Sequence, residues 1–177
     1  MPVVAFFGSS KYGEETEEYQ AAMKISNILA ENKFSIVSGG YGGIMEAALR
    51  GASDHDVVRT GVITAEMPDR KPNDHVDVKI EKSTYAERLL EMIVMADAYV
   101  VFPGGTGTLA ELALVWALKE RKILGEKPII CYGDQWNEVE QIMSFYSETV
   151  IDNINLITHS SDPEKIAELL INGTRGD

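Results

Sequence analysis

The stretch Phe102–Leu112, FPGGTGTLAEL, joins the end of an apolar run to the start of a helical pattern. Its glycines let the backbone come close to a ligand, and its threonines add hydroxyl donors. A buried strand, a glycine-rich turn and a helix in this order are typical of α/β proteins, whose ligands bind at the carboxyl edge of a parallel sheet. The stretch therefore indicates both a fold class and the place of a site.

The rest of the chain repeats this alternation of short apolar runs and helical patterns. Strands are expected at Val3–Phe7, Phe34–Val37, Thr60–Ile63, Val76–Ile80, Ala98–Phe102, Pro128–Tyr132 and Asn155–Ile157. Helices are expected at Glu14–Asn32, Gly43–Ala52, Thr84–Met95, Thr108–Lys119, Trp136–Glu148 and Pro163–Ile171. The alternation predicts an α/β fold, a Rossmann-like doubly wound parallel sheet with helices on both faces. We expect a single domain over residues 1–172 and a flexible tail at 173–177.

Composition excludes several classes of protein. The 177 residues suit one sizeable core, and the formal net charge of −12 opposes attraction to the phosphates of nucleic acid. The single cysteine offers no disulfide framework, and the first residues, MPVVAFFGSS, do not read as a secretory signal. No apolar run approaches the roughly 20 residues that span a membrane. We expect a cytoplasmic protein that binds neither nucleic acid nor membranes.

Three glycine-rich segments follow expected strands, and all three should lie at one edge of the sheet. Helix N-termini at that edge offer free N–H groups to an anion, so the ligand is expected to be a small phosphorylated molecule. The candidate phosphate- or nucleotide-binding residues are Gly8, Ser9, Ser10, Gly39, Gly40, Gly42, Gly43, Gly104, Gly105, Thr106, Gly107 and Thr108. Neither a GxGxxG dinucleotide fingerprint nor a Walker A sequence is present, which argues against hydride transfer and triphosphate hydrolysis.

Glu111 allows two interpretations. Thr108 and Glu111 have the spacing of a capping box, which would make Glu111 a structural residue at the helix start. A carboxylate at the mouth of a phosphate site would instead repel the ligand unless it had a chemical role. Arg88 also allows two interpretations, because it could face the same edge of the sheet or form an i,i+3 ion pair with Glu91. Thr84 and Glu87 repeat the capping pattern, and there we favour a capping role.

The segment PGGTGTLAE, Pro103–Glu111, resembles the PGGxGTxxE signature of the Lonely Guy proteins, the cytokinin riboside 5′-monophosphate phosphoribohydrolases. The resemblance extends to FFGSS, Phe6–Ser10, to GGYGGIM, Gly39–Met45, and to ERLLEMIVMADAYVVFPGGTGT, Glu87–Thr108. Related members are often labelled lysine decarboxylases, but no lysine here has a convincing setting for a Schiff base. Another branch of the superfamily resembles molybdenum cofactor carriers.

The resemblance implies hydrolysis of the N-glycosidic bond of a nucleoside 5′-monophosphate to a free base and ribose 5-phosphate. It implies that Arg88 and Glu111 are catalytic and that residues 104–108 bind the phosphate. Leu89 stands where the family commonly has lysine, and residues 38–47 are closer to the carrier-like branch, so AMP is a safer expectation than a cytokinin nucleotide. No metal or cofactor is required, and a homodimer is implied. The alternative is a non-catalytic carrier of a phosphorylated cofactor.

Three other features are weaker candidates for a functional role. His55 and His75 lie among aspartates, but such loop clusters are usually solvated, so we expect no metal site there. Cys131 ends an apolar run and is expected to be a buried small hydrophobe. The long polar segment Thr64–Asp77 has the length of a functional loop and is a candidate lid over the substrate.

Overall fold

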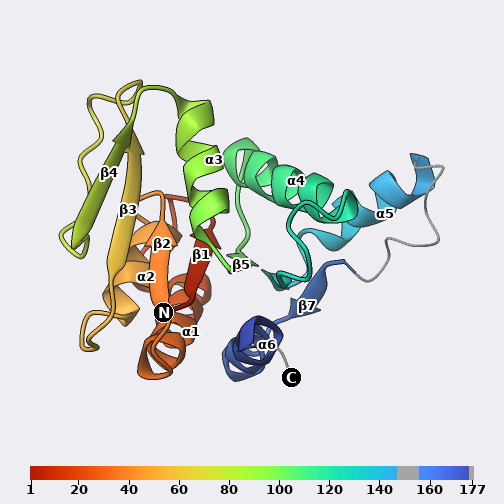
Figure 1. Cartoon of the computed structure of the whole chain (residues 1–177), viewed down its shortest axis with the longest axis horizontal. Helices are drawn as coiled ribbons and strands as arrows, with labels where there is room; N and C mark the ends of the chain where they lie inside the picture. The colour runs from red at the N-terminus through yellow and green to blue at the C-terminus, as the bar shows by residue number, and fades with distance from the viewer. Residues whose placement is uncertain (147–155, 176–177) are drawn as a thin grey trace.

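The computed structural model describes residues 1–146 and 156–175 of the chain. Its centre is a seven-stranded sheet in the order β4-β3-β2-β1-β5-β6-β7, and every neighbouring pair is parallel (Figure 1). The chain fills one half of the sheet from β1 outward and then returns to β5 on the other side of β1. The predicted Rossmann-like doubly wound α/β sheet is confirmed, and its topological switch point lies between β1 and β5.

The strands and helices alternate almost throughout. The strands are β1 (Val3–Phe7), β2 (Ser35–Ser38), β3 (Arg59–Thr64), β4 (Val78–Lys82), β5 (Ala98–Val101), β6 (Ile129–Tyr132) and β7 (Thr158–Ser160). The helices are α1 (Glu17–Glu31), α2 (Ile44–Gly51), α3 (Tyr85–Met95), α4 (Thr106–Glu120), α5 (Asn137–Tyr146) and α6 (Pro163–Arg175). The capping box expected at Thr84 and Glu87 is confirmed at the start of α3.

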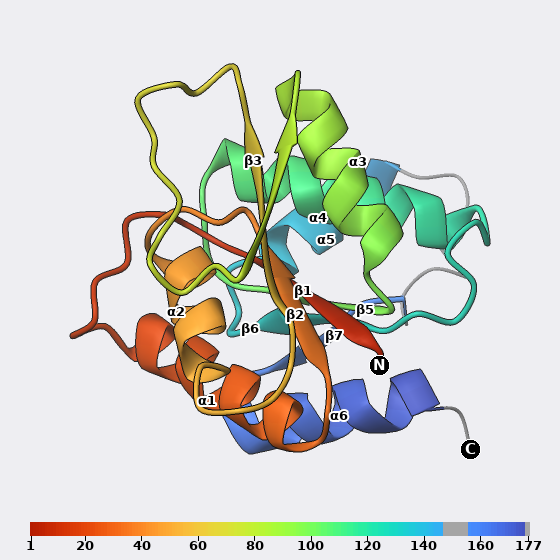
Figure 2. The same cartoon turned by 60° about the vertical axis from the view of Figure 1, so that its left-hand side comes forward.

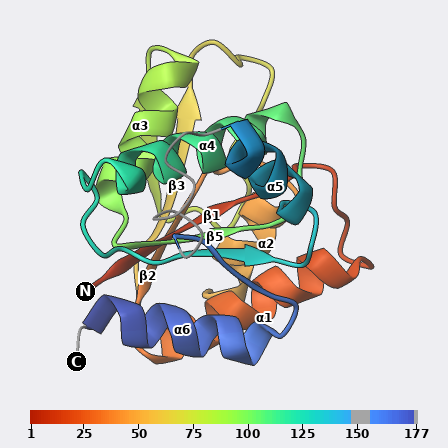
Figure 3. The same ribbon diagram turned by 90° about the vertical axis from the view of Figure 1, so that its right-hand side faces the viewer.

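Helices cover both faces of the sheet. Figure 3 shows α3, α4 and α5 on one face and α1 and α6 on the other, where α2 also lies. Neighbouring residues of β1 point to opposite faces, so Phe6 packs beneath α1, α2 and α6 while Phe7 packs beneath α3 and α4. The strands are buried on both sides, which explains why they read as continuous apolar runs rather than as alternating patterns.

Most predicted boundaries differ from the structure by one to three residues, and three differences are described here. The last strand was expected at Asn155–Ile157, but Asn155 lies outside the described residues and β7 begins only at Thr158, because a polar Thr-His-Ser strand at a sheet edge gives no apolar signal. Of the expected flexible tail at 173–177, residues 173–175 continue α6, and 176–177 lie outside the described part. The third difference, at the start of α4, bears directly on the candidate site.

The connection between β3 and β4 carries no helix over residues 65–77, although the two strands are parallel neighbours. This segment, the candidate lid, projects from the same side of the molecule as the loop after β1 (Figure 2). The side-chain amide of Asn73 donates to the carbonyl oxygens of Gly40 at 3.0 Å and Tyr41 at 2.8 Å. The segment is thus anchored to the loop between β2 and α2.

No helix within residues 1–146 or 156–175 is both long enough and apolar enough to cross a membrane.

Candidate functional site

The three glycine-rich segments meet at the carboxyl edge of the sheet, as the sequence predicts. The Ser9 N–H donates to the carbonyl of Pro103 at 3.3 Å, which joins the segment after β1 to the segment after β5. The Ser9 carbonyl accepts from the Ile44 N–H at 3.0 Å, which joins it to the start of α2. The three segments therefore form one continuous surface beside the switch point, where open α/β sheets bind their ligands.

The loop before α4, residues 103–105, ends at a helix start that is open to a ligand. Gly105 is the N-cap of α4, and no side chain of the described residues caps this end. Gly105 and Thr106 are exposed, and the first N–H groups of a helix have no partner within the helix. The side chain of Gln135 fixes the loop by bonding both the N–H and the carbonyl of Gly104, each at 3.0 Å. The result is a candidate anion-binding position, held in place by a residue of the loop after β6.

The loop before α2, residues 39–43, is instead filled by the protein itself. Gly39, Gly40 and Gly43 are buried, and the first N–H group of α2 is taken by the Ser9 carbonyl. The φ of Gly43 is 67°, and a Cβ there would collide with Ser9. These glycines allow close packing of loops rather than exposing a row of N–H groups.

Arg88 enters the site from α3 and is only 4% exposed. Its Nε donates to the Val62 carbonyl at 2.7 Å and its Nη2 to the Gly39 carbonyl at 3.1 Å. The guanidinium carbon lies 5.3 Å from the centroid of the Tyr41 ring and 5.6 Å from that of Tyr85, both cation–π distances. Carbonyl and ring contacts fix the orientation of the guanidinium while leaving its charge available to an anion.

The alternative interpretation of Arg88 as a partner of Glu91 is wrong. Glu91 forms an ion pair with Lys82 at 2.8 Å instead. Within the described part of the chain, no carboxylate forms an ion pair with Arg88.

Glu111 does not cap α4. The helix begins at Thr106, two residues earlier than expected, so Thr108 and Glu111 lie inside it and the capping-box interpretation of Glu111 is wrong. Glu111 is 7% exposed, and no hydrogen bond or ion pair to another described residue satisfies its carboxyl group. Burial raises the pKa of Glu111 from 4.5 to about 8, and the positive charge of Arg88 opposes part of this rise. A buried, unpartnered acid with such a pKa is typical of a functional site.

Tyr85 connects the arginine to the glutamate. The pKa of its hydroxyl is raised chiefly by burial and also by the negative charge of Glu111, while Arg88 lowers it. The hydroxyl also lies 3.1 Å from the position of a Cβ on Gly107, so it borders the first turn of α4. The backbone N–H of Tyr85 is held by the carboxylate of Glu66, at 2.7 Å, from the segment between β3 and β4. Arg88, Tyr85 and Glu111 thus converge on the open end of α4.

Sequence reasoning missed the aromatic and basic lining of this site. Tyr41 lies in the middle of the glycine motif of residues 39–43, and Tyr85 is one helical turn before Arg88. Arg70, which is exposed, places its guanidinium carbon 5.6 Å from the Tyr41 ring centroid. Its segment reads only as a polar loop, so no sequence signal pointed to it.

The histidines singled out as weak metal candidates have ordinary surroundings. His55 lies 2.9 Å from the amide oxygen of Asn27, and the backbone N–H of His75 bonds the side chain of Asn73 at 3.0 Å. In the described ranges, the potential metal ligands that gather in a group of three are Cys131, Glu140 and His159, at the β7 edge of the sheet. Cys131 is buried, as expected.

Comparison with known proteins places the chain in a family. Residues 1–166 match the model of the SLOG cluster4 family. An uncharacterized protein of Archaeoglobus fulgidus is 31% identical over 73% of this chain and 83% of its own length. The cytokinin riboside 5′-monophosphate phosphoribohydrolase of Mycobacterium marinum is 30% identical over 75% of this chain and 71% of its own length.

The similarity to a plant enzyme covers less of the relative. The Arabidopsis thaliana cytokinin riboside 5′-monophosphate phosphoribohydrolase LOG2 is 32% identical over 65% of this chain, and the match spans 55% of the enzyme's length.

Solved structures share the fold over almost the whole chain. The molybdenum cofactor binding protein of Rippkaea orientalis matches with a TM-score of 0.76 at 23% identity, over 96% of this chain and 95% of its own. The molybdenum cofactor carrier protein of Chlamydomonas reinhardtii matches with a TM-score of 0.72 at 21% identity, over 99% of both chains. At these identities the likeness establishes the fold alone. The family match over residues 1–166 identifies the chain as a member of the SLOG cluster4 family, which has distant homologues among the Lonely Guy phosphoribohydrolases.

Proposed function

We propose that the protein is a nucleoside 5′-monophosphate phosphoribohydrolase that hydrolyses the N-glycosidic bond of AMP or an N6-substituted AMP. The observation that carries this proposal is Glu111, a buried carboxyl group without a partner that lies beside Arg88 and Tyr85 at the open end of α4. A protein that only held a phosphate would gain nothing from a buried acid at this position, and the ionised form of that acid would repel the ligand. A hydrolase that develops positive charge on ribose gains from it.

The substrate's phosphate is proposed to bind at the N-terminus of α4. Gly104, Gly105 and Gly107 keep the backbone accessible, and the hydroxyls of Thr106 and Thr108 add donors. We propose that two neighbouring segments line this position, the loop before α2 and the residues Gly8, Ser9 and Ser10. Ser9 forms hydrogen bonds to both the segment after β5 and the start of α2. The helix dipole and the nearby cations offset the repulsion expected from a chain of net charge −12.

Catalysis is proposed to use Glu111 as a carboxylate. Water attacks the anomeric carbon of the ribose, the bond to the base nitrogen breaks, and the base leaves with a proton. Positive charge develops on the ribose in this step, so an ionised carboxylate in a buried site stabilises it strongly. The reacting molecules are those in which Glu111 is already ionised, and the positive charge of Arg88 increases their fraction by lowering the pKa of Glu111. Arg88, fixed by carbonyl groups, complements the phosphate or the departing base.

The proposed enzyme is a homodimer, as its family resemblance implies. Leu90 and Val94 are exposed apolar residues on α3, 47% and 76% exposed, and they lie on the helix that carries Arg88. Light scattering of the purified protein tests this part of the proposal, and a monomeric mass would refute it. Segment 64–77 is proposed to close over the substrate, which protection from proteolysis on addition of AMP would reveal.

The second candidate function is a non-catalytic carrier of a phosphorylated cofactor. The observation in its favour is the likeness to molybdenum cofactor carrier structures over nearly the whole chain, whereas the plant phosphoribohydrolases match over about half of their length. A carrier would use the open end of α4 in the same way but would not need Glu111.

An assay of nucleoside monophosphate hydrolysis distinguishes the hydrolase from the carrier. The purified protein is incubated with a panel of nucleoside 5′-monophosphates that includes AMP and its N6-isopentenyl form, and free base and ribose 5-phosphate are measured. Release from AMP or its derivative supports the hydrolase and ranks the bases. A folded protein that releases no base from any of them, yet is stabilised against heat by a phosphorylated pterin, would favour the carrier.

A further inference from the structure

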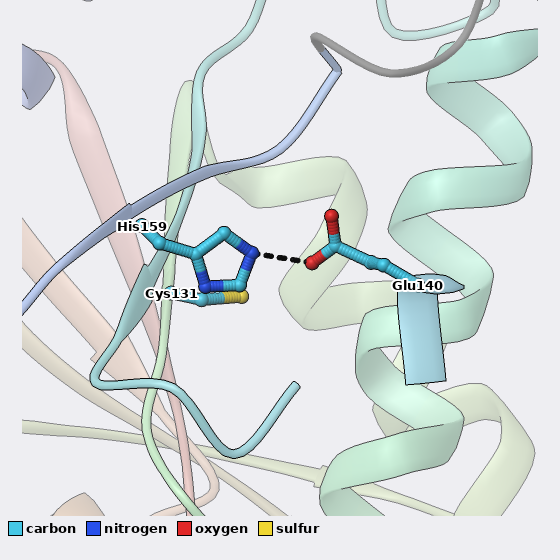
Figure 4. Close-up of side chains that lie close together, drawn as sticks. All are labelled: Cys131, Glu140 and His159. Atoms are coloured by element: carbon cyan, nitrogen blue, oxygen red, sulfur yellow. Dashed lines mark hydrogen bonds and ion pairs between the residues drawn. The ribbon is translucent and has the colours of Figure 1, made fainter. Parts of the chain in front are cut away.

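Outside the site at the switch point, a second group of chemically capable side chains lies at the β7 edge of the sheet. Cys131 is the third residue of β6, His159 is the middle residue of β7, and the two are direct register partners. Partners on neighbouring parallel strands point to the same face of a sheet. Glu140 reaches this pair from α5, which lies on the same side of the sheet as α3 and α4 (Figure 3), and its carboxylate points toward the His159 ring (Figure 4). The Cys131 sulfur, a His159 ring nitrogen and a Glu140 oxygen all lie within 4.8 Å of one another.

We propose that Cys131, Glu140 and His159 form a binding site for a zinc ion that is separate from the phosphate site. A thiolate, an imidazole and a carboxylate are the three ligand types that zinc takes in proteins, and three protein ligands with a water in the fourth position make a complete tetrahedral site. The His159 and Glu140 side chains are 19% and 21% exposed, so solvent can supply that water.

The orientation of His159 fits this role. Its Nδ1 lies 3.3 Å from the Gly133 carbonyl, and its Nε2 lies 2.5 Å from the Glu140 carboxylate. A histidine that ligates a metal through one nitrogen almost always holds a carbonyl or carboxylate with the other, which fixes the ring. Here the carbonyl of Gly133 holds Nδ1, so Nε2 is the ligating atom.

The required adjustment is small. Zinc–ligand bonds of about 2.0–2.3 Å in a tetrahedron place the ligand atoms roughly 3.3–3.6 Å apart. The Glu140 oxygen and His159 nitrogen must therefore separate by about 1 Å, and the sulfur must approach by a similar distance at most. Side-chain rotation supplies movements of this size without a change in the sheet.

The alternative role of a nucleophilic cysteine does not fit the same geometry. A reactive thiol needs a base that takes its proton, but the His159 nitrogen bonds the carboxylate of Glu140 rather than the thiol. The Cys131 side chain is fully buried, and burial together with the charge of Glu140 raises the pKa of the thiol. A zinc ion would stabilise the thiolate in this buried position. Its binding displaces two protons, one from the thiol and one from the contact between Glu140 and His159.

Metal binding by the full chain tests the proposal without any assay of activity. The metal-free protein is titrated with Zn²⁺ by calorimetry in two buffers of different ionisation enthalpy, and with Co²⁺ in a spectrophotometer. The expected results are one zinc per chain, release of protons, and a near-ultraviolet thiolate-to-cobalt absorption band. Zinc should also raise the Tm, since it binds only the folded arrangement that joins β6, β7 and α5.

Variants separate this site from chance binding. Cys131→Ser and His159→Gln should each weaken zinc binding by about 100-fold and abolish the cobalt band, and Glu140→Gln should weaken binding by about tenfold or more. Glu138→Gln on the same helix and His55→Gln serve as matched controls that should bind zinc as the unaltered chain does. If Cys131→Ser fails to fold by circular dichroism, His159→Gln carries the test.

Two results would overturn the proposal. One is a wild-type protein that binds no zinc and gives no cobalt band, which would leave the cluster with the structural contact between His159 and Glu140 and no metal. The other is equal zinc binding by the wild type and the His159→Gln variant. Both outcomes are independent of phosphoribohydrolase activity.

Discussion

The loop before α2 and the loop before α4 each follow a strand in the middle of the sheet, are rich in glycine, and end at a helix whose N-cap is glycine without a side-chain cap. Their surroundings differ. The first N–H group of α2 bonds the Ser9 carbonyl, and the carbonyls of Gly39 and Gly40 accept from Arg88 and Asn73. At α4, by contrast, Gly105 and Thr106 are exposed.

This difference teaches that a glycine loop has two uses at a sheet edge. In the loop before α2, the absence of side chains on the glycines lets other parts of the chain pack closely against the backbone. A Cβ on Gly39 would overlap the Arg88 guanidinium. In the loop before α4, a Cβ on Gly105 would meet no atom within 4 Å. The first loop therefore positions Arg88, while the second leaves space for a ligand.

The largest expected effect follows replacement of the acid behind the loop before α4. Glu111→Gln keeps the size of the side chain and removes its charge, so turnover of AMP should fall by about 10²–10³-fold. The Tm should not fall, because Glu111 neither caps α4 nor forms a hydrogen bond within the described structure. Steady-state kinetics and a thermal melt check this. A lower Tm with unaltered turnover would restore the structural interpretation of Glu111.

The next effect belongs to the loop before α2. Gly43→Ala places a Cβ against Ser9 at a positive φ, which should cost about 1–2 kcal/mol for the backbone conformation and about 1–3 kcal/mol for overpacking. Urea unfolding measures the loss. If the variant were as stable as the wild type, the tight contact between the loops after β1 and β2 would not exist in solution.

The pH dependence of stability tests the burial of Glu111. Its pKa is 4.5 when exposed and about 8 in the fold, so the folded protein holds the extra proton between these values. Stability is therefore complete below about pH 4.5, falls as the pH rises, and levels off above about pH 8, with a total on the order of a few kcal/mol. The difference in unfolding free energy between wild type and Glu111→Gln isolates this contribution. A difference that is flat from about pH 5 to 8 would contradict the buried carboxyl group.

The same group sets the pH dependence of turnover. If the carboxylate is the active form, kcat/KM for AMP rises with pH and levels off near pH 8. A falling profile over this range would assign Glu111 as a proton donor to the departing base instead.

Gly105→Ala should affect binding and not the fold. The new methyl group meets open space in the protein and occupies the position proposed for the phosphate, so kcat/KM should fall by about 10–100-fold. Stability should stay within about 0.5 kcal/mol of the wild type. Inhibition by ribose 5-phosphate, measured alongside, reports the phosphate affinity, and an unchanged inhibition constant would move the phosphate away from this loop.

The smallest effect concerns capping. Thr106→Ala should change stability by less than about 0.5 kcal/mol, because the side chain is exposed and does not cap α4. Thr84→Ala is the matched control, since Thr84 caps α3 and its loss should cost about 1 kcal/mol. Equal losses in the two variants would show that both helices are capped.

Much of the architecture could be predicted because buried parallel strands leave a strong apolar signal. The runs that became β1, β5 and β6 needed almost no correction, and the three glycine segments do meet at one edge. The position of β7 was not predicted correctly, because an edge strand of polar residues carries no such signal. The start of α4 was not predicted because Thr108 and Glu111 match a capping box by spacing, and spacing alone cannot show that Gly105 is the N-cap and that the helix begins at Thr106.

The sequence by itself determined the α/β class, the edge of the sheet at which the three glycine-rich segments meet, and the two charged residues that the family resemblance selects, Arg88 and Glu111. These follow from periodicity and local motifs, which act over a few neighbouring residues. Only the tertiary structure decided that one glycine loop is filled and the other open, that Glu111 is buried without a partner, and that Cys131 and His159 are neighbours. Burial, pKa and ligand geometry arise between residues far apart in the chain, so no local pattern contains them.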